Sequence, residues 1–212
     1  MKKGYFVTGT DTGIGKTAVS CALIRAFARL GKRTAGMKPV SSGGDDAFRL
    51  SSAGGIDLPE EWVNPCNFSE PVAPHIAARR EGRKIETDRI VKAYQAIDSD
   101  IVIVEGVGGF LVPLDENLDT SIIPVLLDIP VILVVGMRLG AINHALLTRD
   151  AIMSRGLRLS GWIANRIDPE MRAFEEVQEA IETRMGAPLL DVLPHDPEER
   201  FEIDLSKLLS RP

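Results

Sequence analysis

The stretch GYFVTGTDTGIGKTAVSCALIRAFARL, residues 4–30, decides the fold of this chain. Its first residues, Tyr5-Phe6-Val7, favour a strand, and the glycine-rich run Thr8–Thr17 follows directly. Beyond that run, apolar residues recur at the spacing of one helix face. They are Val19, Ala22, Leu23, Ala26, Phe27 and Leu30. The stretch therefore predicts a strand, a glycine-rich turn and a helix in succession.

The glycine-rich run has the composition of a phosphate-binding loop. Glycine lets the backbone approach a polyphosphate closely and point several N–H groups at it. Lys16 is placed to reach the β and γ phosphates and the Thr17 hydroxyl to ligate Mg²⁺, while the helix N-terminus adds partial positive charge. We predict that the loop binds a nucleoside triphosphate; the simpler alternative is a turn that only links strand to helix.

One position of the loop departs from the usual pattern, GxxxxGK[ST]. Thr10 stands where the first glycine is expected, and the leading glycine is Gly9, one residue earlier. The loop is therefore a variant, although Lys16 and Thr17 stand correctly before the helix.

Length and composition predict a single domain over residues 1–212. The chain has 212 residues, 44% of them hydrophobic and 26% charged, which allows a sizeable core. Its formal net charge of −5 argues against a nucleic-acid binder, because such proteins usually carry a basic face. The nearest basic run, Arg79–Lys84, includes Glu81 and no aromatic residue, which is typical of a solvated helix end.

The chain shows no targeting, membrane or metal-cluster pattern. Met1-Lys2-Lys3 leads directly into the first predicted strand, which leaves no room for a signal peptide, and no apolar run approaches the length of a membrane span. Cys21 and Cys66 have no paired spacing and the three histidines are isolated, so neither a disulfide framework nor a zinc site is expected. We expect a cytoplasmic protein that contacts no membrane.

Two further predicted strands end in charged residues. Thr34–Val40 is expected to be the second strand, and Lys38 near its end points to the region of the phosphate loop, because ligands of open α/β sheets lie beyond the carboxyl ends of the strands. A merely solvated lysine is the alternative. Ile101–Gly106 has four apolar residues followed by Glu105, which resembles a Walker B strand with its metal-binding acid. Gly106–Gly109 then lets the backbone approach a ligand closely.

Asp45 and Asp46 follow a small-residue loop and begin a helix that is expected to reach about Ser52. Carboxylates at a helix start are ordinary caps, but beside Mg·ATP one of them can also complete the oxygen shell of the metal. Residues 59–74 are predicted to form a long irregular connection, because they hold four prolines and show no clear period.

The remaining pattern alternates helices and strands. Helices are predicted at 74–80, at 88–97 with Thr87 as cap, at 119–127, from about 139 to Gly156, and after Asp168-Pro169; strands are predicted at 130–136, 159–165 and 189–194. In the last two helices the expected inward residues are Ile142, Ala145, Leu146, Ile152 and Met153, then Ala173, Phe174, Val177, Ala180 and Ile181. This alternation predicts an α/β fold with a mostly parallel sheet and helices on both faces, the P-loop NTPase fold.

Several separated motifs resemble the dethiobiotin synthetase family in order and spacing. They are Gly9–Thr17, Lys38–Gly43, Val104–Gly109 and Leu139–His144, together with Glu70–His75 and Gly161–Asn165. The resemblance spans nearly the whole chain and implies an ATP-dependent ring closure in biotin biosynthesis. One amine of 7,8-diaminononanoate takes up CO₂ as a carbamate, the carbamate attacks the γ-phosphate, and the second amine displaces phosphate to give dethiobiotin.

The resemblance also implies a set of site residues. Thr17, Asp46 and Glu105 would hold Mg²⁺; Thr12, Lys38 and Ser42 would face the carbamate and diamine, with Lys16, Lys38 and Thr12 as the catalytic residues. ATP would be bound by Gly13, Ile14, Gly15, Lys16, Thr17, Ala18, Asp46, Glu105, Gly106, Val107, Gly108, Asn165, Arg166, Pro194, His195 and Asp196, with Asn165 and the Pro194 loop reading adenine.

The family works as a homodimer with the substrate at the subunit interface. The resemblance places the carboxylate tail of the substrate at the start of the neighbouring subunit's helix, where Gly140, Ala141 and Asn143 stand. A helix N-terminus is a ready anion site, so the transfer is physically sensible.

Three positions depart from the family pattern. Gly13 stands where many relatives carry an acid, Arg166 follows Asn165 where some have an acid, and the loop before Asp46 is short, which leaves Asp45 as an alternative metal ligand.

The main alternative from another class is a regulatory ATPase switch of the partition or septum-placement type. Those proteins carry a lysine near the start of the loop, and Asp11 occupies that position here. A cobyrinate-type amide synthetase would need a glutamine-hydrolysing domain, for which the chain has no room, and a purely structural role would leave Lys16, Thr17, Lys38 and Glu105 together by chance.

Overall fold

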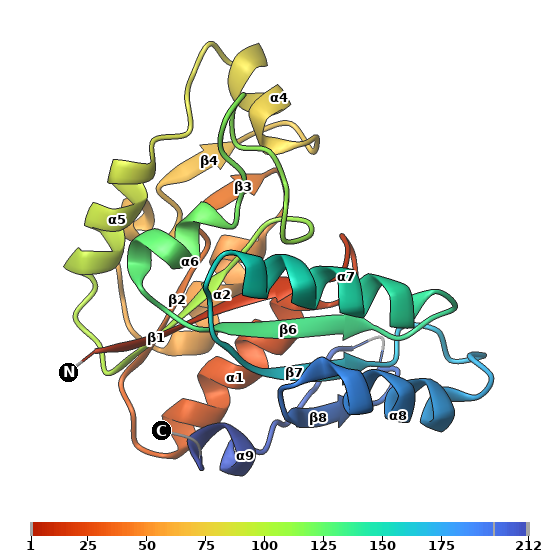
Figure 1. Ribbon diagram of the computed structural model, residues 1–212. Helices are drawn as coiled ribbons and strands as arrows, with labels where there is room; N and C mark the ends of the chain where they lie inside the picture. Colours follow the sequence, from red (N-terminus) through yellow and green to blue (C-terminus); the bar gives the residue numbers. More distant parts are fainter. Residues whose placement is uncertain (1, 197, 211–212) are drawn as a thin grey trace.

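The computed structural model describes residues 2–196 and 198–210. Within these residues, a six-stranded sheet of order β2-β5-β1-β6-β7-β8 forms the centre, and every neighbouring pair of its strands is parallel (Figure 1). The strands are β1 (Lys3–Gly9), β2 (Thr34–Met37), β5 (Ile101–Glu105), β6 (Val131–Gly136), β7 (Leu159–Asn165) and β8 (Leu189–Leu193). The predicted parallel α/β architecture is therefore confirmed.

The central strands are apolar on both faces, and successive residues join different cores. In β5, Ile101 and Ile103 pack into one cluster, while Val102 and Val104 pack into the other. Such runs are typical of strands that helices cover on both sides, because both rows of side chains must leave water.

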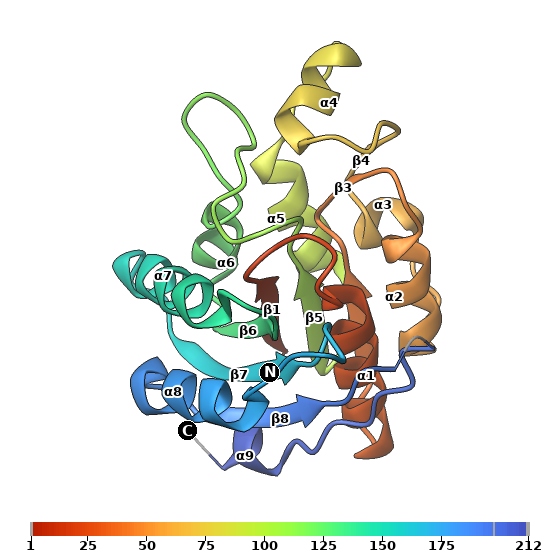
Figure 2. The ribbon, with the colours of Figure 1, turned by 90° about the vertical axis from the view of Figure 1, so that its right-hand side faces the viewer.

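Helices cover the two faces of the sheet. One face carries α1 (Lys16–Arg29), α2 (Asp46–Gly54) and α9 (Ser206–Leu209), and the opposite face carries α5 (Thr87–Ala96), α6 (Ile122–Leu127), α7 (Ala141–Ser154) and α8 (Phe174–Met185). Figure 2 shows α1 and α2 on one side of the sheet and α6, α7 and α8 on the other. The carboxyl ends of the strands point toward the loops that begin α1, α2 and α7, which gathers those loops at one edge.

The chain leaves the main sheet earlier than the sequence predicts. The expected strand Thr34–Val40 is wrong at its end: β2 stops at Met37, and residues 40–42 form a separate strand, β3 (Val40–Ser42). Lys38 donates its backbone N–H to Val63 O at 2.7 Å, and Pro39 has no N–H with which to continue a ladder. Lys38 therefore lies at the junction between the two sheets.

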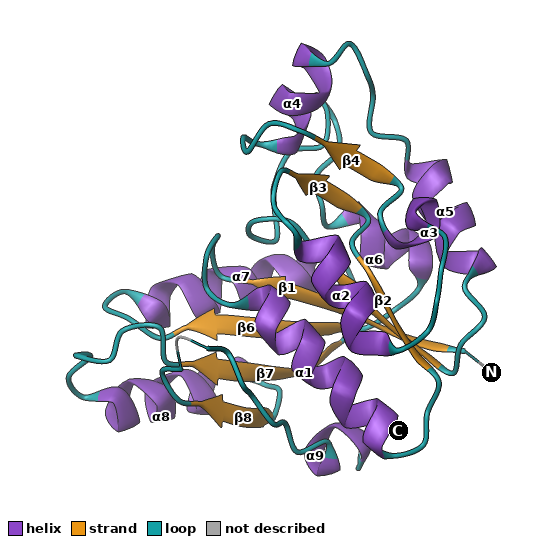
Figure 3. Ribbon diagram, turned by 180° about the vertical axis from the view of Figure 1, so that it is seen from behind, coloured by secondary structure: helices purple, strands orange, loops and turns teal. Residues whose placement is uncertain are grey.

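The partner of β3 lies in the segment that we predicted to be irregular. Residues 59–74 hold α3 (Glu60–Val63) and β4 (Cys66–Phe68), which pairs in parallel with β3 (Figure 3). α4 (Pro74–Arg80) follows, where the sequence predicts a helix. The two short elements escaped prediction because three or four residues carry no readable periodicity.

Two helix starts differ from prediction. α8 begins at Phe174 and not after Asp168-Pro169, because the Asp168 carboxylate accepts the Glu170 N–H at 3.0 Å and closes a local turn instead. Thr87 lies inside α5, which has Glu86 at its N-cap.

Some predicted inward residues face solvent. Ala173 precedes α8 at φ 54° and is exposed, and Met153 is 60% exposed. The structured region after β8 was not predicted: Phe201, Ile203, Leu205 and Leu208 are buried against the face that α1 covers. None of the helices in the described part of the chain has both the length and the apolar character that a membrane crossing requires.

Candidate functional site

The glycine-rich loop joins the end of β1 to the start of α1. Gly15 is the N-cap of α1 at φ 85°, a left-handed conformation that glycine adopts without strain. A Cβ at Gly15 would also lie 2.4 Å from Asn165 Nδ2, so close that only glycine fits. At the variant position, the Thr10 hydroxyl accepts the Gly136 N–H at 3.2 Å and thereby ties the loop to β6. The loop is thus held between the first strand, β6 and the end of β7.

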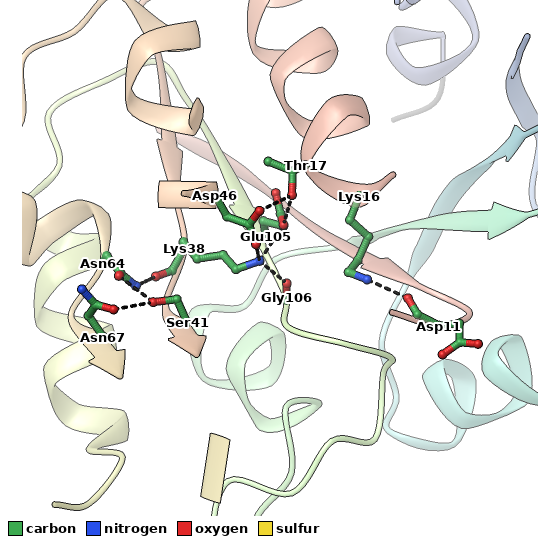
Figure 4. Close-up of polar contacts among 10 residues, drawn as sticks. All are labelled: Asp11, Lys16, Thr17, Lys38, Ser41, Asp46, Asn64, Asn67, Glu105 and Gly106. Carbon is green, nitrogen blue, oxygen red and sulfur yellow. Dashed lines mark hydrogen bonds and ion pairs between the residues drawn. The ribbon is translucent and has the colours of Figure 1, made fainter. Parts of the chain in front are cut away.

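Lys16, the first residue of α1, turns its side chain back over the loop. Its ammonium donates to Asp11 O at 2.7 Å (Figure 4), and the residue is only 7% exposed. Burial, together with the nearby charge of Lys38, lowers the pKa of Lys16 to about 8. A cation so poorly solvated gains most from an anion placed beside it.

Four elements bring a lysine, two carboxylates and a hydroxyl together. The Lys38 ammonium lies 2.7 Å from Asp46 Oδ2, 2.6 Å from Glu105 Oε1 and 3.1 Å from Gly106 O. The Thr17 hydroxyl lies 2.9 Å from both Asp46 Oδ1 and Glu105 Oε1 (Figure 4). These residues come from the end of β2, the start of α2, the end of β5 and the start of α1. We call this group, Thr17, Lys38, Asp46 and Glu105, the lysine–carboxylate cluster.

The lysine–carboxylate cluster is buried and strongly coupled. Lys38 is 2% exposed and Glu105 is 0% exposed. Burial alone would lower the pKa of Lys38, but the adjacent Glu105 and Asp46 charges outweigh it and raise the pKa. Burial likewise opposes ionisation of Asp46, yet the Lys38 charge and hydrogen bonds lower its pKa. The lysine is thus held charged.

The oxygen atoms of the cluster fit Mg²⁺. Glu105 Oε2 is buried and has no hydrogen-bond partner among the described residues, so it is free to meet a cation. No group of three or more His, Cys, Asp or Glu side chains within residues 2–196 and 198–210 is placed to hold a metal ion. Two carboxylates and a hydroxyl agree with Mg²⁺, which usually takes one or two carboxylates together with substrate phosphates and water.

The glycine-rich turn after β5 lies against the phosphate loop. A Cβ at Gly108, which has φ 63°, would lie 3.5 Å from the Thr12 hydroxyl oxygen, and a Cβ at Gly109 would lie 3.7 Å from Gly9 O. Val107, which precedes Gly108, packs against the hydrophobic core. The Ser42 hydroxyl is buried and has no hydrogen-bond partner among the described residues. Thr12 and Ser42 thus both offer hydroxyls that no described side chain engages.

A hollow of about 210 Å³ lies beside the phosphate loop. It brings together the predicted residues Gly13, Gly15, Asn165, Arg166, His195 and Asp196. Asn165 donates its side-chain N–H to Ile14 O at 2.8 Å, so its amide also fixes the loop. Among the described residues Pro194 is exposed and does not line the hollow. The buried Ile14 and Ala18 support the loop from the core.

The start of α7 lies beside the phosphate loop but outside the lysine–carboxylate cluster. Arg138 forms an ion pair with Asp11, and Gly140 caps α7 at φ 91°. Ala141 is buried, whereas Asn143 is exposed. Of the predicted substrate residues, Lys38 belongs to the lysine–carboxylate cluster, Thr12 lies in the phosphate loop and Ser42 ends β3, whereas Gly140, Ala141 and Asn143 lie at the start of α7.

The sequence did not single out several residues around the site. Ile167, Glu199 and Phe201 also line the hollow, and Asn64 contacts the backbone of Lys38. Asn64 lies in the segment 59–74, which the sequence predicts to be irregular, so no periodicity there indicates a role for it. The sequence marks Asp11 only as the residue that replaces a lysine, although its backbone carbonyl accepts a hydrogen bond from the Lys16 ammonium.

The parallel sheet, the glycine-rich loop at the end of β1 and the acid at the end of β5 define a nucleotide-binding protein with the P-loop NTPase fold. The sequence profile of a family described as AAA domain matches residues 3–200. Among solved structures, the septum site-determining protein MinD of Pyrococcus horikoshii OT3, complexed with Mg-ADP, aligns with a TM-score of 0.62 at 17% identity, over 93% of this chain and 83% of that chain. That likeness concerns the fold alone.

Two curated relatives are much more similar in sequence. The ATP-dependent dethiobiotin synthetase BioD of Nitrosospira multiformis is 50% identical over 99% of this chain and 95% of the relative. The protein of the same name from Aromatoleum aromaticum is 50% identical over 91% of each chain. The chain belongs to the ATP-dependent dethiobiotin synthetase family.

Proposed function

We propose that this protein closes the ureido ring of dethiobiotin from 7,8-diaminononanoate, CO₂ and ATP, with release of ADP and phosphate, as a cytoplasmic ligase of biotin biosynthesis. The proposal depends mainly on the Lys38 ammonium, which lies 2.6 Å from Glu105 Oε1 and 2.7 Å from Asp46 Oδ2. Thr17, which follows the phosphate loop, contacts the same two carboxylates. Relatives at 50% identity over nearly the whole chain are dethiobiotin synthetases, which supports the same chemistry here.

The proposed reaction has three steps. One amine of the diamine attacks CO₂ and loses a proton, which gives a carbamate. A carbamate oxygen then attacks the γ-phosphorus of ATP, the bond to the bridging oxygen breaks, and ADP leaves. Finally the second amine attacks the carbonyl carbon of the carbamic-phosphoric anhydride, phosphate leaves with the bonding electrons, and the five-membered ring closes with loss of a proton.

Charge neutralisation is the main task of the protein in this reaction. A carbamate and a triphosphate repel each other, and two cations offset this repulsion: Lys16 at the end of the phosphate loop and Lys38 in the lysine–carboxylate cluster. Neither residue needs to form a covalent bond, since positioning and electrostatics supply most of the catalysis in phosphoryl transfer. The unpartnered hydroxyl of Ser42 and the exposed Thr12 are proposed to orient the carbamate and the diamine.

Thr17, Asp46 and Glu105 are the proposed Mg²⁺ ligands, and the bound ion would neutralise charge on the β and γ phosphates. In this arrangement the buried Glu105 oxygen that has no partner among the described residues would gain a cationic neighbour. In this proposal Lys38 neutralises charge on the carbamate, and Lys16 neutralises charge on the phosphates.

ATP is proposed to lie along the phosphate loop, from Gly13 to Ala18, and across the turn Gly106-Val107-Gly108. Its adenine would enter the hollow beside Asn165 and Arg166, which His195 and Asp196 also line. Pro194 would act there only through the backbone of its loop, because its side chain is not part of the lining.

The proposed working unit is a homodimer. Apolar side chains are exposed just before α7 and within it: Leu139 is 97% and Leu147 is 61% exposed, and a second copy would cover them. The carboxylate tail of the diamine would meet the start of α7 of the partner subunit, where backbone N–H groups and the helix dipole attract an anion. Asn143, which is exposed there, would hydrogen-bond the same carboxylate.

The regulatory ATPase switch is not favoured. At the loop position where such switches carry a lysine, this chain has Asp11, whose carboxylate pairs with Arg138 of the same chain. An acid in that position lacks the positive charge with which the lysine of those switches contacts the phosphates of a neighbouring subunit.

The test is phosphate release from Mg·ATP and bicarbonate, with and without 7,8-diaminononanoate, with the product identified by mass. The proposal expects phosphate release that depends on the diamine and a product with the mass of dethiobiotin. ATP hydrolysis at the same rate with and without the diamine would reject the proposal. So would a product that lacks the carbonyl carbon supplied by CO₂.

A further inference from the structure

The backbone of Lys38 is held from both sides by one short segment. Its N–H donates to Val63 O at 2.7 Å. Its carbonyl accepts the side-chain N–H of Asn64 at 2.6 Å (Figure 4). Pro39 follows Lys38 and restricts its backbone to extended conformations. Both peptide groups that flank the Lys38 Cα are therefore fixed, at the point where the chain leaves the main sheet.

Asn64 can take only one orientation in this network. Its N–H₂ group must face the Lys38 carbonyl, because a carbonyl only accepts hydrogen bonds. Its oxygen then faces the Ser41 hydroxyl at 2.8 Å, and that hydroxyl donates its one proton to it. Asn67 Oδ1 lies 3.0 Å from the same hydroxyl, and Asn67 is not among the hydrogen-bond partners of Lys38. Asn64 thus uses both ends of its amide, and Asn67 is an exposed neighbour of the network.

Burial makes this hydrogen bond costly to lose. Asn64 is 6% exposed, Ser41 is 6% exposed and Lys38 is 2% exposed, so water cannot easily replace the amide. The Lys38 side chain spans from this fixed backbone to Glu105 and Asp46, with contacts of 2.6 Å and 2.7 Å at its end. A shift at the Lys38 carbonyl would move the base of that side chain and loosen the ammonium at its tip.

We propose that Asn64 is a positioning residue that aims the Lys38 ammonium at the reacting carbamate. This inference rests on the proposed function, in which Lys38 neutralises the carbamate. Asn64 itself touches neither of the two carboxylates and lies on the far side of Lys38 from the phosphate loop (Figure 4). It acts on the reaction only through the geometry of Lys38.

The test compares Asn64→Ala with the wild-type protein under saturating diamine and bicarbonate. We expect kcat for diamine-dependent phosphate release to fall on the order of tenfold, because small displacements of a catalytic group reduce rates steeply. The Kd for ATP, measured by titration without diamine, should stay within about twofold, since the phosphate loop and the hollow do not contact Asn64. Activity is measured well below the melting temperature of the variant, so that loss of folded protein does not lower kcat.

The matched control is Asn67→Ala, which removes an amide at the same hydroxyl without touching Lys38 and should leave kcat unchanged. If Asn64→Ala does not fold, Ser41→Ala decides the question, because it removes the hydroxyl that holds the Asn64 oxygen, should loosen the amide against the Lys38 carbonyl, and should lower kcat in the same selective way. The inference is wrong if kcat of the folded variant matches the wild type, or if ATP affinity falls as much as kcat. A wild-type protein without diamine-dependent turnover would instead reject the proposed function.

Discussion

Replacing Lys38 by methionine keeps the apolar stem of the side chain and removes its charge. In the protein without ligands this leaves Glu105 buried, 0% exposed, without the cation at 2.6 Å. Removing one partner of a buried ion pair costs about 3 to 5 kcal/mol, and we expect the lower end because the Asp46 side chain, the other partner, is 34% exposed and can relax into water. For a chain of this size, about 3 kcal/mol corresponds to a fall of roughly 6 to 12 °C in melting temperature.

The same substitution should separate catalysis from nucleotide binding. Phosphate release with diamine and bicarbonate should fall by at least about 100-fold, since the charge that stabilises the carbamate in the transition state is gone. ATP affinity should change only a few-fold, because Lys16 and the loop backbone hold the triphosphate. Adding Mg·ATP without diamine should also raise the melting temperature of Lys38→Met more than that of the wild type, since the bound cation restores a partner to Glu105.

Calorimetry, ATP titration and a phosphate-release assay on the two proteins measure these effects. Equal losses of turnover and ATP affinity would show that Lys38 serves the nucleotide and not the carbamate. An unchanged melting temperature would contradict the view that the Lys38–Glu105 pair is a buried, coupled pair.

Three further predictions concern other parts of the chain. The pKa of Lys16 is lowered from 10.5 to about 8, so between these pH values the folded protein binds fewer protons than the unfolded chain. The free energy of unfolding of the ligand-free wild type should therefore rise by up to roughly 3 kcal/mol as pH increases through that window. Denaturant titrations measure this gain, and Lys16→Met should lack it. Ala173→Gly should raise the free energy of unfolding by about 1 kcal/mol, because Ala173 has φ 54°, a left-handed backbone conformation that glycine adopts more easily than alanine. The control Ala180→Gly, inside α8, should lower the free energy of unfolding by a similar amount. A destabilised Ala173→Gly would refute the reasoning. Asn143→Ala should raise the KM for the diamine about tenfold with little change in the KM for ATP, and an unchanged diamine KM would count against a substrate site at the start of α7.

The sequence alone determined the elements that have long or strongly patterned signals. The buried runs at 101–105 and 131–136 predicted two central strands, and the loop before α1 predicted the phosphate site, because glycines and a lysine at fixed spacing have a local physical cause. Residues at strand ends, Lys38 and Glu105, could be assigned to one edge because parallel strands place their carboxyl ends together. Short elements such as α3, β3 and β4 could not be predicted, since a few residues show no period.

Only the tertiary structure decided how these residues meet. No spacing in the sequence tells that the Thr17 hydroxyl lies 2.9 Å from two carboxylates that are 29 and 88 residues away along the chain. Nor does it show that Asn64 holds the backbone of Lys38, or that the segment around Phe201 packs over α1 and helps to line the hollow. Such contacts depend on how separate elements pack against one sheet. Packing buries polar groups, and buried polar groups need hydrogen-bond partners, which local propensity does not determine.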